Sequence, residues 1–157
     1  MKIVLMVILI SIIMIIAKAI SSQFKDKYEF YYNLKLFLNE FKINLSFKHD
    51  KLNEFLTKTK ASSSFSVFIN EYQSYLKTGE INLNKISFLD NEEIEFLEDI
   101  IKNIGKYDAK NEVLQIENFI LLVEQKLTKA EKDKTSLCPM IINLSFLFSI
   151  GLVIILI

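Results

Sequence analysis

The sequence is poor in the residues that build disulfides, tight turns and anion clamps. It has 157 residues with one cysteine, one proline, one histidine, three glycines, and neither tryptophan nor arginine. The single cysteine, Cys138, excludes a disulfide within the chain, and with it the framework of many small secreted domains. Without arginine, no guanidinium group can make a bidentate contact with phosphate or carboxylate. The 19 lysines are balanced by 19 acidic residues, so no basic surplus indicates nucleic acid as a partner.

Patterns that mark an enzyme are also missing. The three glycines are far apart, and none belongs to a phosphate-binding loop or to a Gly-x-Ser-x-Gly nucleophile turn. His49 stands beside Asp50 in a charged segment, far in sequence from Cys138, so no His/Cys cluster for zinc is formed. We therefore expect a protein that is not an enzyme, and we assign no catalytic residue, no cofactor-binding residue, no metal ligand and no cofactor.

The densest cluster of charge is acidic and lies in the middle of the chain. It could be a divalent-cation site or a surface that docks a basic partner. The alternative is that these acids begin a helix, where they interact favourably with the helix dipole and face solvent. Calcium loops need a glycine and alternating oxygen ligands, which this run lacks, so we favour the helix start. Its members are Glu92, Glu93, Glu95, Glu98 and Asp99.

An apolar segment follows the first two residues. It runs from Ile3 to Ala17 and reaches Ile20 if the Lys18 side chain extends toward the lipid headgroups. A cleaved signal peptide is the alternative, because Lys2 supplies a charged start and residues 17–19 have the small-x-small form of a cleavage site. We favour a retained membrane anchor, since the other end of the sequence also indicates a membrane protein.

A second apolar segment covers residues 140–157 and contains no charged residue. Eighteen residues of this kind are typical of a membrane-spanning helix. We expect Pro139 to stand in the first turn of this helix, where proline is tolerated.

These segments predict an all-α protein in three parts: a transmembrane helix at 3–20, a soluble helical domain at 21–136 and a transmembrane helix at 137–157. Lysines gather on the domain side of both apolar segments, and only Lys2 lies beyond them. The positive-inside rule therefore places the domain in the cytoplasm. If the first segment were cleaved, the domain would face outward from a single anchor. The lysines are Lys18, Lys25, Lys27, Lys126, Lys129, Lys132 and Lys134.

Apolar residues recur at helical spacing throughout the middle domain. We expect helices at 26–47 and 51–58, and a third that starts at the serines 62–64 and stops at Gly79. The segment 80–89 is expected to be a loop with one helical turn. The first helix would bury Tyr28, Tyr31, Leu34, Leu38, Phe41 and Leu45; the third would bury Phe65, Phe68, Ile69, Tyr72 and Leu76.

Asp90 and Glu93 have the spacing of a capping box, which predicts that a helix begins there and ends at Gly105. Asp108 would cap the longest helix, at 109–134, which is expected to continue almost directly into the second apolar segment. Its apolar residues step by three and four, as in a coiled coil or an antiparallel helix pair, and we favour packing within the chain. They are Val113, Ile116, Ile120, Val123, Leu127 and Ala130.

Several short motifs, in this order, resemble the stage III sporulation protein AB family of endospore-forming bacteria. Ile104-Gly105-Lys106-Tyr107-Asp108 is similar to a Leu-Gly-x-Ser-Asp turn of that family, and Glu112 stands where the family has glutamine. Residues 151–157, Gly-Leu-Val-Ile-Ile-Leu-Ile, resemble its aliphatic end. Further matches are Phe41, Leu45, Phe47, Leu52, Glu54, Leu56 and Ala130.

The resemblance implies a fold similar to the inner-membrane platform protein of type II secretion. It also implies a non-enzymatic scaffold in a channel complex between mother cell and forespore. The partners would be the membrane, the stage III sporulation ATPase (protein AA) and other subunits of the channel; a homo-oligomer is a further expectation. The alternative is a membrane-tethered helical adaptor or envelope protein unrelated to sporulation.

Overall fold

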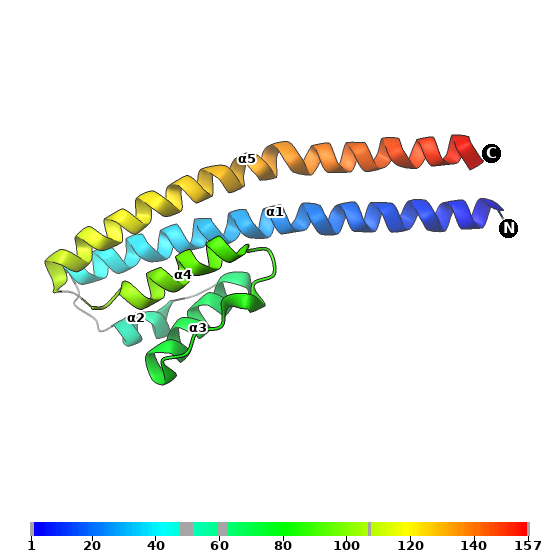
Figure 1. Ribbon diagram of the computed structural model, residues 1–157. Coiled ribbons are helices and arrows are strands. Elements are labelled where there is room, and N and C mark those ends of the chain that lie inside the picture. The colour runs from blue at the N-terminus through cyan, green and yellow to red at the C-terminus, as the bar shows by residue number, and fades with distance from the viewer. Residues whose placement is uncertain (1, 48–51, 60–62, 107, 157) are drawn as a thin grey trace. The chain divides into compact units, whose positions relative to one another are not determined.

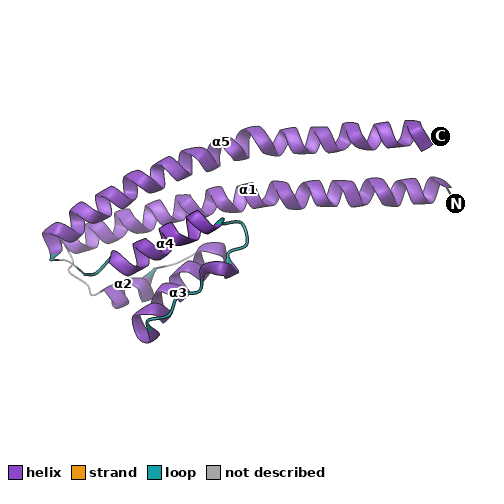
Figure 2. Ribbon diagram, in the orientation of Figure 1, coloured by secondary structure: helices purple, strands orange, loops and turns teal. Residues whose placement is uncertain are grey.

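The computed structural model describes residues 2–47, 52–59, 63–106 and 108–156. Within these residues every regular element is a helix, and no strand is present (Figures 1 and 2). The all-α prediction is confirmed. The elements are α1 (Lys2–Phe47), α2 (Leu52–Lys58), α3 (Ser63–Thr78), the 3₁₀ turn η1 (Leu83–Lys85), α4 (Asn91–Asn103) and α5 (Ala109–Leu156).

Helices α1 and α5 are each continuous through an apolar and a polar half. The first apolar segment and the predicted helix 26–47 form the single helix α1. The predicted helix 109–134 continues through the second apolar segment as α5, as expected. The chain divides into two compact units: one combines Met1–Tyr28 with Thr128–Ile157, and the other is Glu29–Leu127.

An aromatic cluster forms the core of the unit 29–127. The ring of Phe30 on α1 lies 5.7 Å from that of Phe65 and 5.9 Å from that of Phe68, both on α3. Phe41, three turns further along α1, lies 5.1 Å from the ring of Phe55 on α2. These tilted and edge-to-face pairs add to the burial of large apolar surfaces. Phe30, Phe41, Phe55, Phe65 and Phe68 are therefore core residues.

Within the same unit, α5 is antiparallel to α1. Lys35 Nζ lies 2.8 Å from Glu124 Oε1, and Lys42 Nζ lies 3.5 Å from Glu117 Oε1. Seven residues forward on α1 thus correspond to seven residues back on α5. Val123 of the predicted seam is fully buried. This confirms that the seam packs within the chain.

Helix ends in this unit follow the sequence signals. Asp90 Oδ1 accepts a hydrogen bond from Glu93 N at 2.9 Å, and Glu93 Oε2 accepts one from Asp90 N at 3.1 Å, so the capping box is present. Gly79 and Gly105 follow α3 and α4 with φ of +76° and +90°, which side chains with a Cβ rarely adopt. The serine cap predicted for α3 falls on Ser62, which lies outside the described residues.

Two expectations for buried residues are wrong or incomplete. Leu76 is 41% exposed, because α3 continues for a turn beyond Tyr72, its last core residue. Helical spacing predicts that α4 buries a stripe of Ile94, Leu97, Ile101 and Ile104. Ile100, outside this stripe, is also fully buried. A stripe that steps strictly by three and four is narrower than the face a helix buries when it packs against more than one neighbour.

In the unit that combines 1–28 with 128–157, small residues lie where α1 and α5 meet. Ala17, Ser21 and Cys138 are buried, and the Cys138 thiol donates a hydrogen bond to the Ser21 carbonyl at 3.3 Å. Small side chains let two helix backbones approach closely, as is common between membrane helices. Lys134 Nζ lies 3.9 Å from the ring centroid of Tyr28, which adds a cation–π contact.

The placement expected for Pro139 is wrong. It lies in the interior of α5 rather than in the first turn of a separate helix. Proline removes one backbone N–H and crowds the preceding turn, yet a helix that continues on both sides can accommodate this loss. Such prolines are tolerated in membrane helices.

Candidate functional surface

The described residues among those considered for chemistry are Cys138 and the acidic run 92–99, and no metal-binding group is found among them. Cys138 is buried, and its thiol donates a hydrogen bond to a backbone carbonyl. His49 lies outside the described residues. Among the described residues, no three His, Cys, Asp or Glu side chains are grouped so that they could hold a metal ion.

The acidic run divides between structural and exposed roles on α4. Glu93 is buried in the capping box. Glu98 accepts a hydrogen bond from Lys102 one turn later at 2.6 Å. Asp99 accepts one from Asn103, while Glu92 and Glu95 are exposed. The run therefore begins and lines a helix, as the sequence interpretation favoured.

Glu112 has a structural role that sequence reasoning missed. Its side chain is 2% exposed, and its Oε1 accepts a hydrogen bond from Gly105 N at 2.6 Å. A buried carboxylate needs such partners, because an unpaired charge away from water is costly. Nearby, the Tyr72 hydroxyl reaches the Ile104 carbonyl at 3.5 Å. A Cβ at Gly105 would also approach the Leu52 side chain at 3.1 Å. These residues hold together the turn between α4 and α5.

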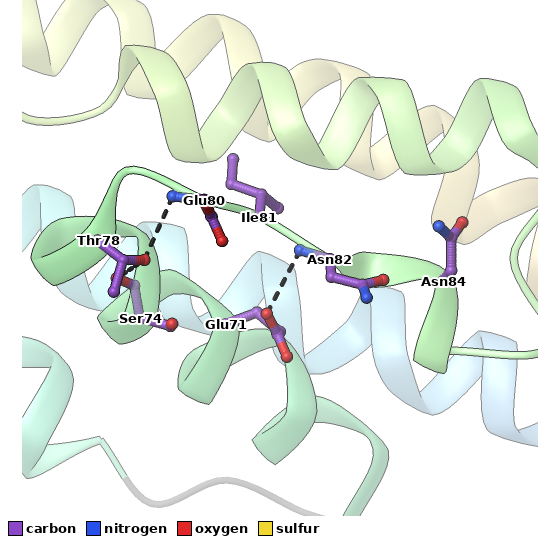
Figure 3. Close-up of a pocket in the computed structure, with 7 residues that line it drawn as sticks. All are labelled: Glu71, Ser74, Thr78, Glu80, Ile81, Asn82 and Asn84. Carbon is purple, nitrogen blue, oxygen red and sulfur yellow. Dashed lines mark hydrogen bonds between the residues drawn. The ribbon is translucent and has the colours of Figure 1, made fainter.

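A polar pocket opens between the end of α3 and the segment before η1 (Figure 3). Two of its lining side chains hold that segment in place. Glu71 accepts hydrogen bonds from Asn82 N at 3.3 Å and from the Lys85 ammonium. Thr78 Oγ1 accepts one from Glu80 N at 3.3 Å (Figure 3). The lining contains no histidine, cysteine or lysine, and of its two carboxylates Glu71 already accepts the two hydrogen bonds given above.

The polar halves of α1 and α5 carry an unusual exposed surface. Six apolar side chains in these halves are between 43% and 58% exposed. One of them, Leu122, points about 100° away from its neighbour Leu121. We call the other five the outer apolar face: Tyr32, Leu36, Ile43, Leu114 and Leu121. Clusters of exposed apolar residues often mark sites of contact with another protein.

The apolar halves of α1 and α5 are candidate membrane spans. Each helix is long enough, and only 11% of the most apolar stretch in each is buried. The core helix of a soluble protein would be mostly buried, so this exposure is as expected of helices in lipid.

The class is thus an all-helical protein with two candidate membrane spans and a helical unit between them, without a recognisable catalytic centre among the described residues. The family model for stage III sporulation protein AB matches residues 2–157. The chain belongs to this family, and its role therefore lies in sporulation. No curated protein and no solved structure matches the chain.

The sequence predicts the family and the membrane spans but not the outer apolar face. The family and both apolar segments were predicted. The outer apolar face was missed, because Leu36 and Ile43 fall between the residues of the buried stripe. The signal that could have found it is their spacing of seven, repeated by Leu114 and Leu121.

Proposed function

We propose that this protein is a non-enzymatic membrane platform of a sporulation-specific, secretion-like channel complex between mother cell and forespore. The match of the family model to residues 2–157 carries this proposal. Both apolar halves anchor the protein, and the helical unit between them lies in the cytoplasm of the mother cell, where it docks the ATPase of the complex.

Two features of the molecule support a scaffold. The candidate spans belong to the same helices, α1 and α5, that contribute to the unit 29–127, so each anchor is joined to the unit without an intervening loop. The unit itself has a well-packed aromatic core and exposed helix faces. A platform needs contact surfaces, and energy at such surfaces is concentrated in a few anchor residues rather than in a reactive group.

The sidedness is tested by labelling. In a Cys138→Ser background, Glu80→Cys places one exposed thiol in the middle of the chain. The positive-inside rule predicts that a membrane-impermeant maleimide does not reach it in intact mother cells and labels it after lysis. A reporter fused after Ile157 should be active on the opposite side. Labelling of Glu80→Cys in intact cells would reverse the assignment.

The docking of the ATPase is tested by co-purification. The tagged full-length chain, solubilised from membranes of sporulating cells, should retain the stage III sporulation ATPase. An unrelated protein with two membrane spans and the same tag serves as the control. Recovery of other channel subunits without any ATPase would contradict the docking role, while leaving a structural role in the channel.

A further inference from the structure

The outer apolar face lies on the side of α1 and α5 that points away from the other helices of the unit 29–127. Tyr32 and Ile43 each stand two residues after a core phenylalanine, Phe30 or Phe41, and therefore about 160° around the helix from it. On α5, Phe119 contacts Phe96 of α4 at 6.5 Å between ring centroids. Leu121, two residues later, is likewise about 160° away.

The two halves of this face flank the ion pairs between α1 and α5. Leu36 and Ile43 directly follow Lys35 and Lys42, while Leu114 and Leu121 lie one turn on either side of Glu117. The four charged side chains are between 31% and 49% exposed, so the pairs are open to solvent. The face thus consists of a row of lysines on α1, a row of glutamates on α5, and an apolar stripe beside each row.

This arrangement is complementary to itself. Two copies can pack face to face around a two-fold axis parallel to the helices, which sets α1 of one copy against α5 of the other. The lysine row then faces the partner's glutamate row, and each α1 stripe faces an α5 stripe. An axis across the helices would set α1 against α1, with lysine row facing lysine row. Opposite charges favour the first arrangement, and like charges oppose the second.

We infer that the outer apolar face binds a second copy of this chain, with α1 packed against the partner's α5. The charges at each level then alternate, as Lys35 and Glu124 of one copy meet Glu124 and Lys35 of the other, and Lys42 and Glu117 form a second such layer. The interface is isologous, as in most homodimers. This inference goes beyond the proposed function, and its failure would leave the platform proposal standing.

The size of the face indicates how tightly it binds. The stripe on α1 covers about three turns, or about 16 Å, and two adjacent helices are about 20 Å wide, which gives an area of roughly 320 Å² for each copy. The total of roughly 650 Å² is below the size of a stable interface between soluble proteins, so the contact is a weak one. Such a contact forms where copies are concentrated, as two copies held in one membrane would be, because tethering raises the effective concentration.

Cysteine cross-linking in isolated membranes tests the arrangement. Two differently tagged full-length chains, both with Cys138→Ser, are co-expressed, one with Leu36→Cys and the other with Leu121→Cys. Oxidation should join them efficiently. The matched control replaces Leu121→Cys with Leu122→Cys, a neighbouring leucine that is also exposed at 44% but points about 100° away. We expect at least a several-fold lower yield with this control, and with Leu36→Cys on both chains.

A charge swap gives a second, independent readout. Lys35→Glu and Lys42→Glu combined with Glu117→Lys and Glu124→Lys keep both ion pairs within a chain but exchange the two rows. Swapped chains should cross-link with each other as wild-type chains do, whereas a swapped chain and a wild-type chain should cross-link several-fold less. Three results would overturn the inference and assign the face to another partner. The mixed pair could cross-link as well as the matched pairs. Chains that both carry Leu36→Cys could join efficiently, or no pair could cross-link at all.

Discussion

At the scale of single residues, the hydroxyl groups of two tyrosines are titratable groups buried in the core of the unit 29–127. Burial, and then the nearby carboxylate of Glu93, raise the pKa of Tyr31 far above its usual value of 10.0. Burial and the charge of Glu112 do the same to the pKa of Tyr72. Both hydroxyls therefore lose their protons less readily in the folded protein than in the unfolded chain.

Substitution of Tyr31 tests this dependence on pH. The folded state binds the tyrosine proton more tightly than the unfolded state, so stability is unaffected below pH 10 and falls as the pH rises above it. The fall is at most about 1.4 kcal/mol per pH unit for each such tyrosine. Tyr31→Phe should therefore reduce the loss of stability between pH 10 and pH 11, measured by chemical denaturation in detergent. Tyr32→Phe, at the exposed neighbouring position, should leave it unchanged; an equal effect of both would refute the buried origin.

Val123 tests the assignment of the seam between α1 and α5. Its side chain is fully buried, so Val123→Asp places an unpaired charge in the core and should cost on the order of 3 kcal/mol or more. Leu122→Asp introduces the same charge one residue earlier, at an exposed position, and should cost less than about 1 kcal/mol. Thermal unfolding of the detergent-solubilised chain, followed by circular dichroism, measures both. Similar losses would mean that the buried face of α5 is wrong.

Much of the core was predictable residue by residue, because burial follows helical spacing. Phe65, Phe68 and Tyr72 are buried as expected, whereas Leu76, one further step along the same stripe, is exposed. Spacing shows which side of a helix is apolar but not how far the neighbouring helices extend along it. The role of Glu112 was not predictable, because its partner is the backbone N–H of Gly105, which leaves no mark in the pattern of side chains.

At the scale of elements, helix ends are fixed by local chemistry. Asp90 and Glu93 satisfy backbone N–H groups at the start of α4 that have no partner within the helix. Asp90→Ala should therefore destabilise the protein by about 1 kcal/mol. Glu92→Ala removes one acid from the same turn without touching the cap and should cost no more than about 0.5 kcal/mol. Equal losses would show that the charge of the turn, rather than the capping box, stabilises α4.

In the long helices, local sequence signals are not sufficient to predict where a helix ends. The capping box and the two glycines predicted the ends of α3 and α4 correctly, because these ends depend on a few neighbouring residues. The sequence predicts that Pro139 lies in the first turn of a helix, yet α5 passes through it. Proline makes a helix end favourable but does not require one, and the packing of the surrounding turns decides. The continuity of α1 through Lys18 is of the same kind, since no capping residue or glycine interrupts it there.

At the scale of the whole molecule, the protein belongs to a sporulation family, and its two candidate spans lie on the helices that frame its folded unit. We propose that it acts through anchoring and contact surfaces rather than through a reactive group. Enzymes concentrate their rate enhancement in a few groups, so that a single substitution there often costs orders of magnitude. A scaffold should tolerate the loss of any one candidate group but not the loss of an anchor.

Sporulation efficiency of strains carrying single variants at normal protein level tests this claim most directly. His49→Ala and Cys138→Ser should sporulate within a few-fold of wild type, and serine retains a hydroxyl that can donate to the Ser21 carbonyl. Deletion of residues 140–157 should reduce sporulation by orders of magnitude, and an unrelated apolar span of equal length in their place should restore most of it. Loss of sporulation from His49→Ala alone, with the protein folded and in the membrane, would contradict the account and indicate a catalyst.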